Sequence, residues 1–266
     1  PGLLTKGGFG ELTVNNPDGE ILLPHGVSLE ASGGSSISLA ASNIVIDGSI
    51  IAPSGSLAFR SSNLSLETIN DISAATNRTL PDAFAGRGTF TLGSSALIST
   101  AGELVDDRYN TSLLTLPSLH LDGGSVSIEA YQATLTRGGR LDVSGGAMVN
   151  ALGAVTYGDG GSLSIAAGQD LNLTSVLGGR LSLGSGMSGY SGSKAGSLSI
   201  SAPAIQIGGI GAQAGVTLLD PVIFSQGGFG DFVLTGSGLA SDVAGEYVTG
   251  LHIAPGTSIR PVVSSW

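Results

Sequence analysis

The sequence predicts an all-β fold and, within that class, a parallel β-helix, which is a solenoid with loop excursions. Three observations on the 266-residue chain lead to this prediction: short runs in which every second residue is aliphatic, glycine-rich turns at near-regular spacing, and a phrase that recurs. Alternation with a period of two gives a strand one buried face and one wet face. The chain lacks a window with the 3.6-residue period of an amphipathic helix, so we assign the fold to strands alone.

The alternating runs are about four residues long, and Ser, Thr, Asn or Asp occupies their wet positions. They lie at residues 36–39, 43–46, 125–128, 162–165, 170–173 and 197–200. Because hydroxyls and amides cover the outside in place of Lys and Glu, only 11% of the residues are charged. An average domain is about 25% charged, and an enzyme-like α/β domain needs such charges to cover its helices.

A repeated phrase sets the expected register between coils. Asp-Gly-Gly-Ser-x-Ser-Ile occurs at residues 122–128 and 159–165, and a decayed copy follows at 195–200. We expect the serines and the aliphatic residues of these copies to stack on one another. The expected serine stack is Ser125, Ser162 and Ser197, and the expected aliphatic ladders are Leu163–Leu198 and Ile165–Ile200. A Gly-Arg phrase also recurs, at residues 139–143 and 179–183.

A β-sandwich is the alternative for a string of short strands. It requires strands of about five or six residues and tight hairpin turns, whereas Asn-Gly, the strongest hairpin signal, is absent. A β-helix coil of three short strands takes roughly 20 residues, which predicts about 10–13 coils. We therefore favour the β-helix.

Several segments break the alternation, and we expect them to leave the coil as loops. The two main excursions, at 68–88 and 101–117, hold much of the charge; milder ones lie at 147–161, 184–196 and 236–248. The phrase Gly-Gly-Phe-Gly followed by an acid occurs at 7–11 and returns at 227–231. We predict a β-helix unit over residues 1–221, with excursions near 68–88 and 101–117, and the start of a further β-helical unit, continuous with the first, over residues 222–266.

Charge and composition exclude several function classes. The net charge of −10 repels phosphate backbones, so we expect no nucleic-acid partner. No run of 18 apolar residues is present, so we expect no transmembrane helix. The absence of cysteine excludes a disulfide scaffold and suits an exported chain.

Two motifs with enzymatic connotations occur in glycine-rich surroundings. Residues 184–189 fit the dinucleotide-binding pattern G-x-G-x-x-G, but the pattern requires a helix directly afterwards, and the Gly/Ser-rich residues that follow do not form one. Ser191 and Lys194 fit S-x-x-K, again without a helix to bring the lysine to the serine. We interpret both as loops and predict no cofactor and no catalytic residue.

Histidines and carboxylates are the remaining candidates for chemistry. His25, His120 and His252 have no second ligand at metal spacing, and alternation places the last two toward solvent. Asp122 and Asp159 begin equivalent turns and would stack, but Asp before glycine caps its own backbone, and the third copy has Ala195 where an Asp is expected. We therefore predict no metal site. The adjacent charges in the second excursion are Asp106, Asp107 and Arg108.

Three stretches, at 34–57, 96–128 and 141–163, resemble the coil phrase of filamentous-haemagglutinin-like exoproteins, and the similarity runs over nearly the whole chain. The resemblance implies a right-handed β-helical rod from a very large secreted bacterial protein that is exported through an outer-membrane pore and displayed as an adhesin. It also implies a secreted or cell-surface location.

We expect a structural and adhesive rod, not an enzyme, whose partners are copies of itself, flanking coils of the same polypeptide, and glycans of host or neighbouring cells. Uncovered strand edges would make the segment self-associate end to end. One alternative is a polysaccharide lyase or hydrolase, which needs converging carboxylates such as Asp106 and Asp107. The other is a glycan-binding module that uses tyrosines, namely Tyr109, Tyr131, Tyr157 and Tyr190.

Overall fold

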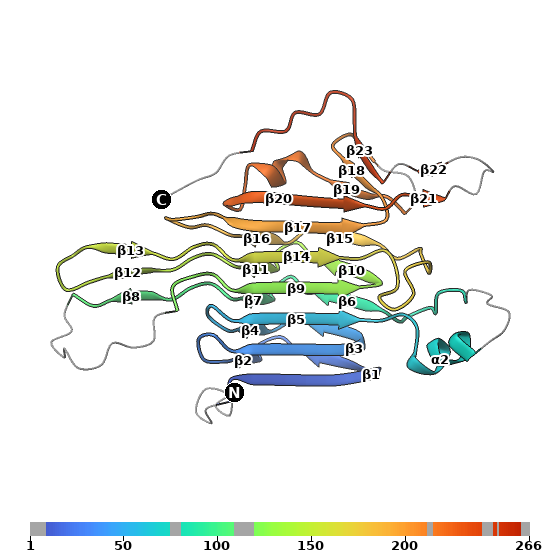
Figure 1. Ribbon diagram of the computed structural model, residues 1–266, viewed down its shortest axis with the longest axis horizontal. Helices are drawn as coiled ribbons and strands as arrows, with labels where there is room; N and C mark the ends of the chain where they lie inside the picture. Colours follow the sequence, from blue (N-terminus) through green and yellow to red (C-terminus); the bar gives the residue numbers. More distant parts are fainter. Residues whose placement is uncertain are drawn as a thin grey trace.

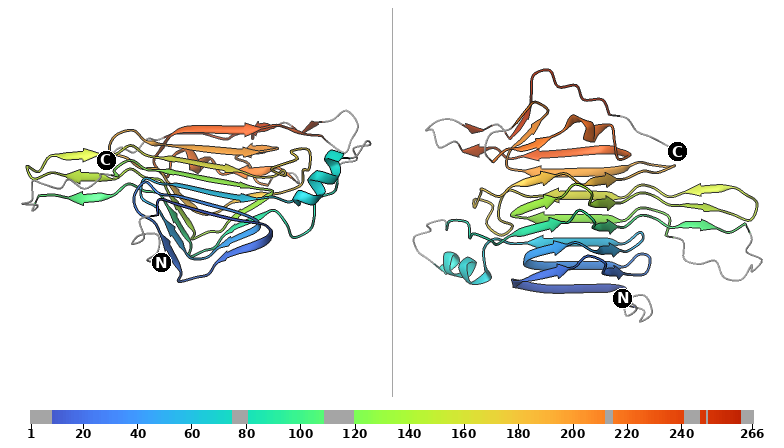
Figure 2. Two further views of the ribbon diagram at one scale, coloured as in Figure 1. Left: turned by 60° about the horizontal axis from the view of Figure 1, so that its bottom comes forward. Right: turned by 180° about the vertical axis from the view of Figure 1, so that it is seen from behind.

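The computed structural model describes residues 9–74, 81–108, 120–211, 215–240, 247–248 and 250–261. These residues form mostly strands, stacked one above another (Figure 1). All strand pairings among them are parallel except β12 with β13 and β21 with β22. The parallel sheets curl around one interior (Figure 2). The two facing antiparallel layers of a sandwich are not formed by these residues.

The largest sheet, here called the main sheet, has ten strands and bends at a corner. On one side of the corner lie β1 (Glu11–Leu23), β3 (Ser36–Ile46), β5 (Ser56–Ser61), β9 (Ser125–Ala130), β14 (Ser162–Ala166), β17 (Gly196–Ala202) and β20 (Phe229–Gly236). The ends of the long strands β1 and β3 continue beyond the corner, beside β6 (Thr89–Leu92), β10 (Gln132–Leu135) and β15 (Leu181–Leu183).

Smaller sheets complete the fold. A five-stranded sheet, here called the second sheet, contains β2 (Ser28–Glu30), β4 (Ser49–Ile51), β7 (Leu97–Ser99), β11 (Arg140–Asp142) and β16 (Gly186–Ser188). At the carboxyl-terminal end lie β18 (Ile205–Ile207), β19 (Thr217–Leu219), the 3-10 helix η1 (Pro221–Phe224), β21 (Leu239–Ala240), β22 (Tyr247–Val248) and β23 (Leu251–Ile253). A projecting arm contains β8 (Leu104–Asp106), β12 (Ala147–Val149) and β13 (Val155–Tyr157) (Figure 1).

The register predicted from the repeated phrase is confirmed. Ser162 pairs with Ser125 on one side and with Ser197 on the other. Leu163 pairs with Leu198 and Ile165 with Ile200. The inward side chains of these strands form the core. Two ladders run through it: Ile37, Leu57, Val126, Leu163, Leu198; and Leu39, Phe59, Ile128, Ile165, Ile200.

The spacing of the paired strands differs from the spacing predicted for coils. Paired residues in successive strands of the main sheet lie from 20 residues apart (Ser36 and Ser56) to 69 residues apart (Ser56 and Ser125). The seven strands on the first side of the corner therefore replace the predicted 10–13 coils. The excess residues leave the stack at its corners. Residues 62–88 separate β5 from β6, while Tyr131 alone separates the equivalent strands β9 and β10. Nevertheless β5 pairs in register with β9, and β6 pairs in register with β10.

The excursions were predicted in part. Residues 68–88 include most of a nine-residue helix, α2 (Leu66–Ala74), which stands outside the stack (Figure 1). The strand-only assignment was wrong here, because a helix of nine residues is too short to show a sustained 3.6-residue period. The helix begins where the Ser65 hydroxyl accepts a hydrogen bond from the Thr68 N–H at 3.1 Å. Of the excursion at 101–117, residues up to 108 are described and include β8.

Two segments were assigned wrongly. Residues 170–173 were expected to form a strand but belong to a loop, because Asp170 turns inward and binds the backbone there. Residues 184–196 were expected to leave the coil, yet β16 lies within them and pairs with β11. The Gly-Arg phrases are also not equivalent: Leu141 pairs with Met187 in the second sheet, whereas Leu181 pairs with Ala133 in the main sheet.

Candidate functional site

The Asp-Gly-Gly-Ser phrases meet at the corner where the chain enters the main sheet. There Gly55, Gly124, Gly161 and Gly196 stack in successive turns. The backbone N–H of the serine after each of the last three glycines donates to the glycine carbonyl one turn away, as from Ser125 to Gly55 at 2.8 Å and from Ser162 to Gly124 at 3.0 Å. A Cβ on Gly124 would overlap the Gly55 carbonyl oxygen. The turns therefore approach so closely that only glycine fits.

The Gly124→Ala substitution is expected to lower the free energy of unfolding by about 1–3 kcal/mol, because the added methyl group forces neighbouring turns apart. Gly10→Ala is the matched control, since a Cβ at Gly10 meets nothing within 4 Å; its effect should stay within about 0.5 kcal/mol. Chemical denaturation measures the free energy of unfolding of the two variants. Equal effects would show that the stacked turns are not tightly packed.

The aspartates of these turns bind the next turn of the stack. Asp122 Oδ1 accepts the backbone N–H of Asp159 at 2.7 Å, and Asp159 Oδ1 accepts that of Lys194 at 3.2 Å. A hydrogen bond from the Ser193 side chain and the Lys194 N–H lower the pKa of Asp159 below its usual value. The expectation that each aspartate caps its own turn was therefore wrong, because the neighbouring turn presents its N–H groups directly to the carboxylate.

The third copy of the phrase has Lys194, not Ala195, at the aspartate position, as the bond from Lys194 to Asp159 shows. In the described residues no group of three His, Asp or Glu side chains is placed to hold a metal ion.

A shallow groove of about 510 Å³ runs along this corner. Glycines, serines, one lysine and one aspartate dominate its lining, which consists of Gly34, Ser54, Gly55, Ser56, Gly123, Gly124, Ser125, Gly160, Gly161, Ser162, Lys194, Ala195, Ser197 and Asp231. We call it the corner groove. It offers hydrogen-bond donors and acceptors along several turns. Its lining contains no histidine to activate a serine as a nucleophile.

The edge of the corner groove is one row of side chains across the main sheet. Each residue of the row pairs with the next one on the neighbouring strand, and the row consists of Glu11, Ser36, Ser56, Ser125, Ser162, Ser197 and Asp231. The Ser125 hydroxyl donates to the Ser56 hydroxyl at 3.0 Å. Strands of a sheet lie about 4.8 Å apart, so the row is a regular line of small hydroxyls with an acid at each end.

The charged residues of the second excursion form a local ion pair. Arg108 binds Asp106 through two hydrogen bonds, Nε to Oδ1 at 2.9 Å and Nη2 to Oδ2 at 2.6 Å. The Arg108 guanidinium lowers the pKa of Asp106 to about 2. A glycosidase acid needs a raised pKa, so Asp106 is unsuited to that role. The Asp107 N–H donates to Val149 O at 2.8 Å, which binds β8 to β12 in the arm.

The histidines lie apart from one another. His25 Nδ1 is 2.8 Å from Ser95 Oγ, and His252 is exposed on β23, as the alternation predicted. His120 is half-buried, with its ring against Gly33 and Gly34. The prediction of a solvent-facing side chain therefore holds for His252 but only in part for His120, which packs on a neighbouring turn.

The G-x-G-x-x-G and S-x-x-K motifs, at residues 184–189 and 191–194, lie in a strand and in a turn of the fold. Residues 184–189 contain β16, and the next element along the chain is the strand β17, so the helix that binds a dinucleotide phosphate is not formed there. Ser191 is buried; its hydroxyl donates to Gly158 O at 2.7 Å and accepts the Ser193 N–H at 2.8 Å. These bonds hold the turn against its neighbour.

The tyrosines do not gather in one place. Tyr109 lies outside the described residues. The Tyr131 hydroxyl donates to Leu177 O at 2.9 Å, and burial, with the nearby Asp170 charge, raises its pKa. The Tyr190 hydroxyl accepts the Gly227 N–H at 3.2 Å. Tyr157 lies on β13 in the arm and is 43% exposed.

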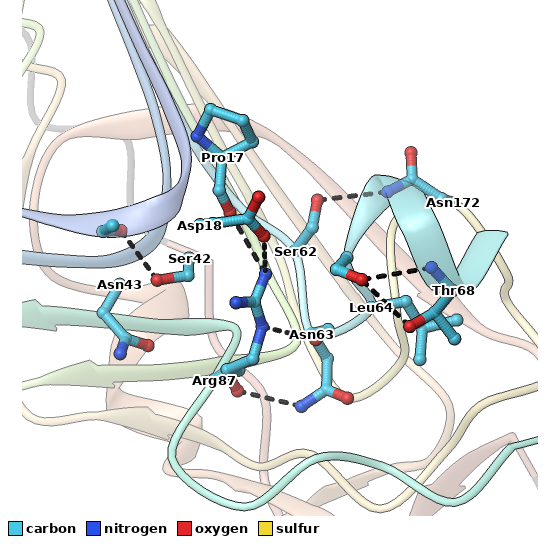
Figure 3. A network of polar contacts seen from close by, with 12 residues as sticks. Pro17, Asp18, Ser42, Asn43, Ser62, Asn63, Leu64, Thr68, Arg87 and Asn172 are labelled. Atoms are coloured by element: carbon cyan, nitrogen blue, oxygen red, sulfur yellow. Dashed lines mark hydrogen bonds and ion pairs between the residues drawn. The ribbon is translucent and has the colours of Figure 1, made fainter. Parts of the chain in front are cut away.

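Sequence reasoning missed a buried polar network at the opposite corner (Figure 3). Asn63 is fully buried; its side chain bonds Phe84 and the carbonyl of Arg87. The Arg87 guanidinium bonds the Asn63 carbonyl and pairs with Asp18 at 3.1 Å, so it connects the excursion to β1. Asp170, also fully buried, accepts the N–H groups of Asn63 and Leu64. Asp170 lies more than 100 residues from Asn63 and Leu64, and Arg87 lies 69 residues from Asp18, so no local pattern indicates the network.

Comparisons with protein families, with curated proteins and with solved structures found no match. None of the helices formed by the described residues is long and apolar enough to cross a membrane.

Proposed function

We propose that this chain is a right-handed parallel β-helix and forms a rod segment of a large bacterial protein of the filamentous-haemagglutinin-like type, secreted or displayed at the cell surface. Its work is mechanical and adhesive. The observation that supports this proposal best is the parallel pairing that continues from strand to strand across the main sheet, from Glu11 to Asp231. Such a stack joins every turn to the next by backbone hydrogen bonds and a continuous aliphatic core, which makes a stiff spacer.

Single-molecule pulling on the two ends of the chain tests the mechanical role. We expect discrete force peaks as turns detach, each releasing a length set by one turn. A turn of about 35 residues extends by on the order of 120 Å. Extension without force peaks would contradict the proposal. The expected end-to-end association is measured by light scattering at increasing protein concentration, and a constant monomer mass would contradict that part alone.

A second candidate, a non-catalytic glycan-binding module, is favoured by the corner groove. Hydroxyls, exposed glycine backbone, Lys194 and Asp231 offer hydrogen bonds to a polar chain lying along the rod. This surface replaces the four tyrosines as the basis of that candidate. A glycan array tests it: binding should fall at least tenfold in a Lys194→Ala, Asp231→Ala double variant and remain unchanged in Tyr157→Ala. Equal binding by both variants would exclude the groove.

The polysaccharide-processing alternative has less support. Asp106 is committed to Arg108, and its depressed pKa suits neither a general acid nor a proton-sharing pair. A screen for reducing ends or unsaturated products against acidic polysaccharides should therefore give no turnover. Turnover that is lost in an Asp106→Asn, Asp107→Asn variant would establish the alternative.

A further inference from the structure

The projecting arm ends in a hairpin turn that carries an aliphatic side chain and no charge. Strands β12 and β13 are antiparallel, and residues 150–154 join them at the outer end of the arm (Figure 1). We call residues 150–154 the arm tip. Leu152 in the arm tip is 93% exposed, and the three residues of β13 that follow it are all exposed. Residues 143–158 contain no charged side chain. Apolar groups that gather on an exposed surface mark an interaction site.

The backbone of the arm tip pairs its own polar groups. Asn150 Oδ1 accepts the N–H groups of Leu152 and Ala154, at 3.0 and 2.9 Å. The Asn150 carbonyl accepts the Gly153 N–H at 2.9 Å, and the Asn150 N–H donates to Ala154 O at 2.9 Å. An unpaired backbone N–H or C=O is costly to remove from water. The arm tip therefore enters an apolar medium at a lower cost than an open loop would.

The side chains change in character from the arm tip toward the stack. The row of paired residues directly behind the tip has Val155 at one edge of the arm and Asp106 at the other. Arg108 binds this aspartate through two hydrogen bonds, so the two charges compensate each other. The next row begins with Tyr157. An aliphatic group in front, with an ion pair and a tyrosine behind it, matches the order of layers at a membrane surface, where tyrosines and charged groups occupy the headgroup level.

We propose that the arm tip is a membrane contact, in which Leu152 enters the boundary between the headgroups and the hydrocarbon of a lipid bilayer without net surface charge. The ion pair and Tyr157 then lie in the headgroup layer. This contact supplies a partner for the proposed adhesive rod, yet it depends on the arm alone, so it stands or falls separately from the rod.

The shape of the arm tip favours a bilayer over a folded protein as the occupant. A stable protein interface buries about 800 Å² on each partner around anchors that fill pockets, whereas the arm tip is a narrow turn with one leading side chain. A lipid surface requires only uncharged, apolar groups on a backbone whose bonds are already made. The net charge of −10 disfavours anionic lipids, so we assign the contact to zwitterionic ones. One turn buries little apolar surface, and we therefore expect reversible binding that strengthens when several arms act together.

Co-flotation of the full chain with phosphatidylcholine vesicles, at increasing lipid concentration, tests the contact. We expect the partition coefficient to fall at least tenfold in Leu152→Asp, because a charge would then lead into the apolar layer. Ile210→Asp is the matched control. Ile210 is a fully exposed aliphatic residue outside the arm, between β18 and β19, so binding should stay unchanged. Both substitutions are at exposed positions, and circular dichroism checks that both variants are folded.

A fluorescent reporter locates the residue that enters the bilayer. The chain has a single tryptophan, Trp266, which is replaced by phenylalanine in the reporter chains. In that background, the emission of Leu152→Trp should shift to shorter wavelength when phosphatidylcholine vesicles are added, while the emission of Ile210→Trp should not. Replacing part of the phosphatidylcholine with phosphatidylglycerol should weaken binding at low ionic strength, because the acidic chain is repelled.

Three results would overturn the membrane contact. They are a folded wild-type chain that stays unbound, equal binding by Leu152→Asp and the wild type, and stronger binding to vesicles that contain phosphatidylglycerol. The last of these would show that basic groups carry the binding in place of the arm tip. Each of these results leaves the rod intact, since the rod is tested by the force peaks on pulling.

Discussion

Replacing Ile128 with alanine is expected to lower the free energy of unfolding by about 2–5 kcal/mol. Ile128 has no exposed surface and lies in the middle of the main sheet, between Phe59 on one side and Ile165 on the other. Because strands β5 and β14 are fixed by their own backbone bonds, the space left by the missing atoms cannot close. The loss therefore includes a cavity as well as the transfer energy of the removed atoms.

Ser127→Ala is the control for this prediction, since Ser127 lies next to Ile128 on the same strand but on its outer face. Its effect should stay within about 0.5 kcal/mol. Chemical denaturation, followed by circular dichroism, measures the two variants. A loss below about 1 kcal/mol for Ile128→Ala would mean that the ladders are loosely packed, which conflicts with a stiff rod.

Asp170→Ala is expected to lower the free energy of unfolding by about 3–5 kcal/mol, because it removes a buried acceptor and leaves its backbone partners unsatisfied. Asp170 Oδ2 accepts the N–H groups of Asn63 and Leu64, at 2.7 and 3.0 Å, and Oδ1 those of Asn172 and Leu173, at 2.9 and 3.0 Å. The variant leaves four backbone donors without an acceptor, and each unsatisfied buried donor costs about 1–3 kcal/mol unless water reaches it.

The free energy of unfolding of Asp170→Asn should lie between that of Asp170→Ala and that of the wild type. The single amide oxygen of the asparagine accepts from one pair of donors, whereas its amino group faces the other pair. Asp106→Ala is the exposed control and should leave the free energy of unfolding close to that of the wild type. We also expect proteolysis within residues 169–180 to accelerate in Asp170→Ala, since the loop loses its anchor. Equal stability of Asp170→Ala and Asp106→Ala would contradict this account.

The sequence predicts those parts of the fold that repeat. The stacking of Ser125, Ser162 and Ser197 was predicted from a phrase whose glycines and alternating residues are both required by the geometry. The observed strand pairing confirms this register. Recurrence alone does not fix a register: the two Gly-Arg phrases have a shape that fits any turn entering a strand, and Leu141 and Leu181 lie in different sheets.

Contacts between excursions lie beyond what pattern reasoning reaches. Asp170 occurs in an alternating run that is indistinguishable in sequence from a strand, yet its carboxylate binds backbone groups more than 100 residues earlier. Lys194 was missed in the candidate site for a smaller reason, a miscount in the third copy: Lys194 stands three residues before Ser197, as Asp159 stands three before Ser162. Its backbone N–H, bound to Asp159, confirms the equivalence.

Long insertions and single residues connect equivalent strands without any change of register, as the passages from β5 to β6 and from β9 to β10 show. The corner after β5 is thus a place where new sequence can be added or removed while the scaffold stays the same. A lineage of such chains is then free to diversify what it presents to its surroundings at the corners, and a protein engineer is equally free to graft a foreign loop or small domain there.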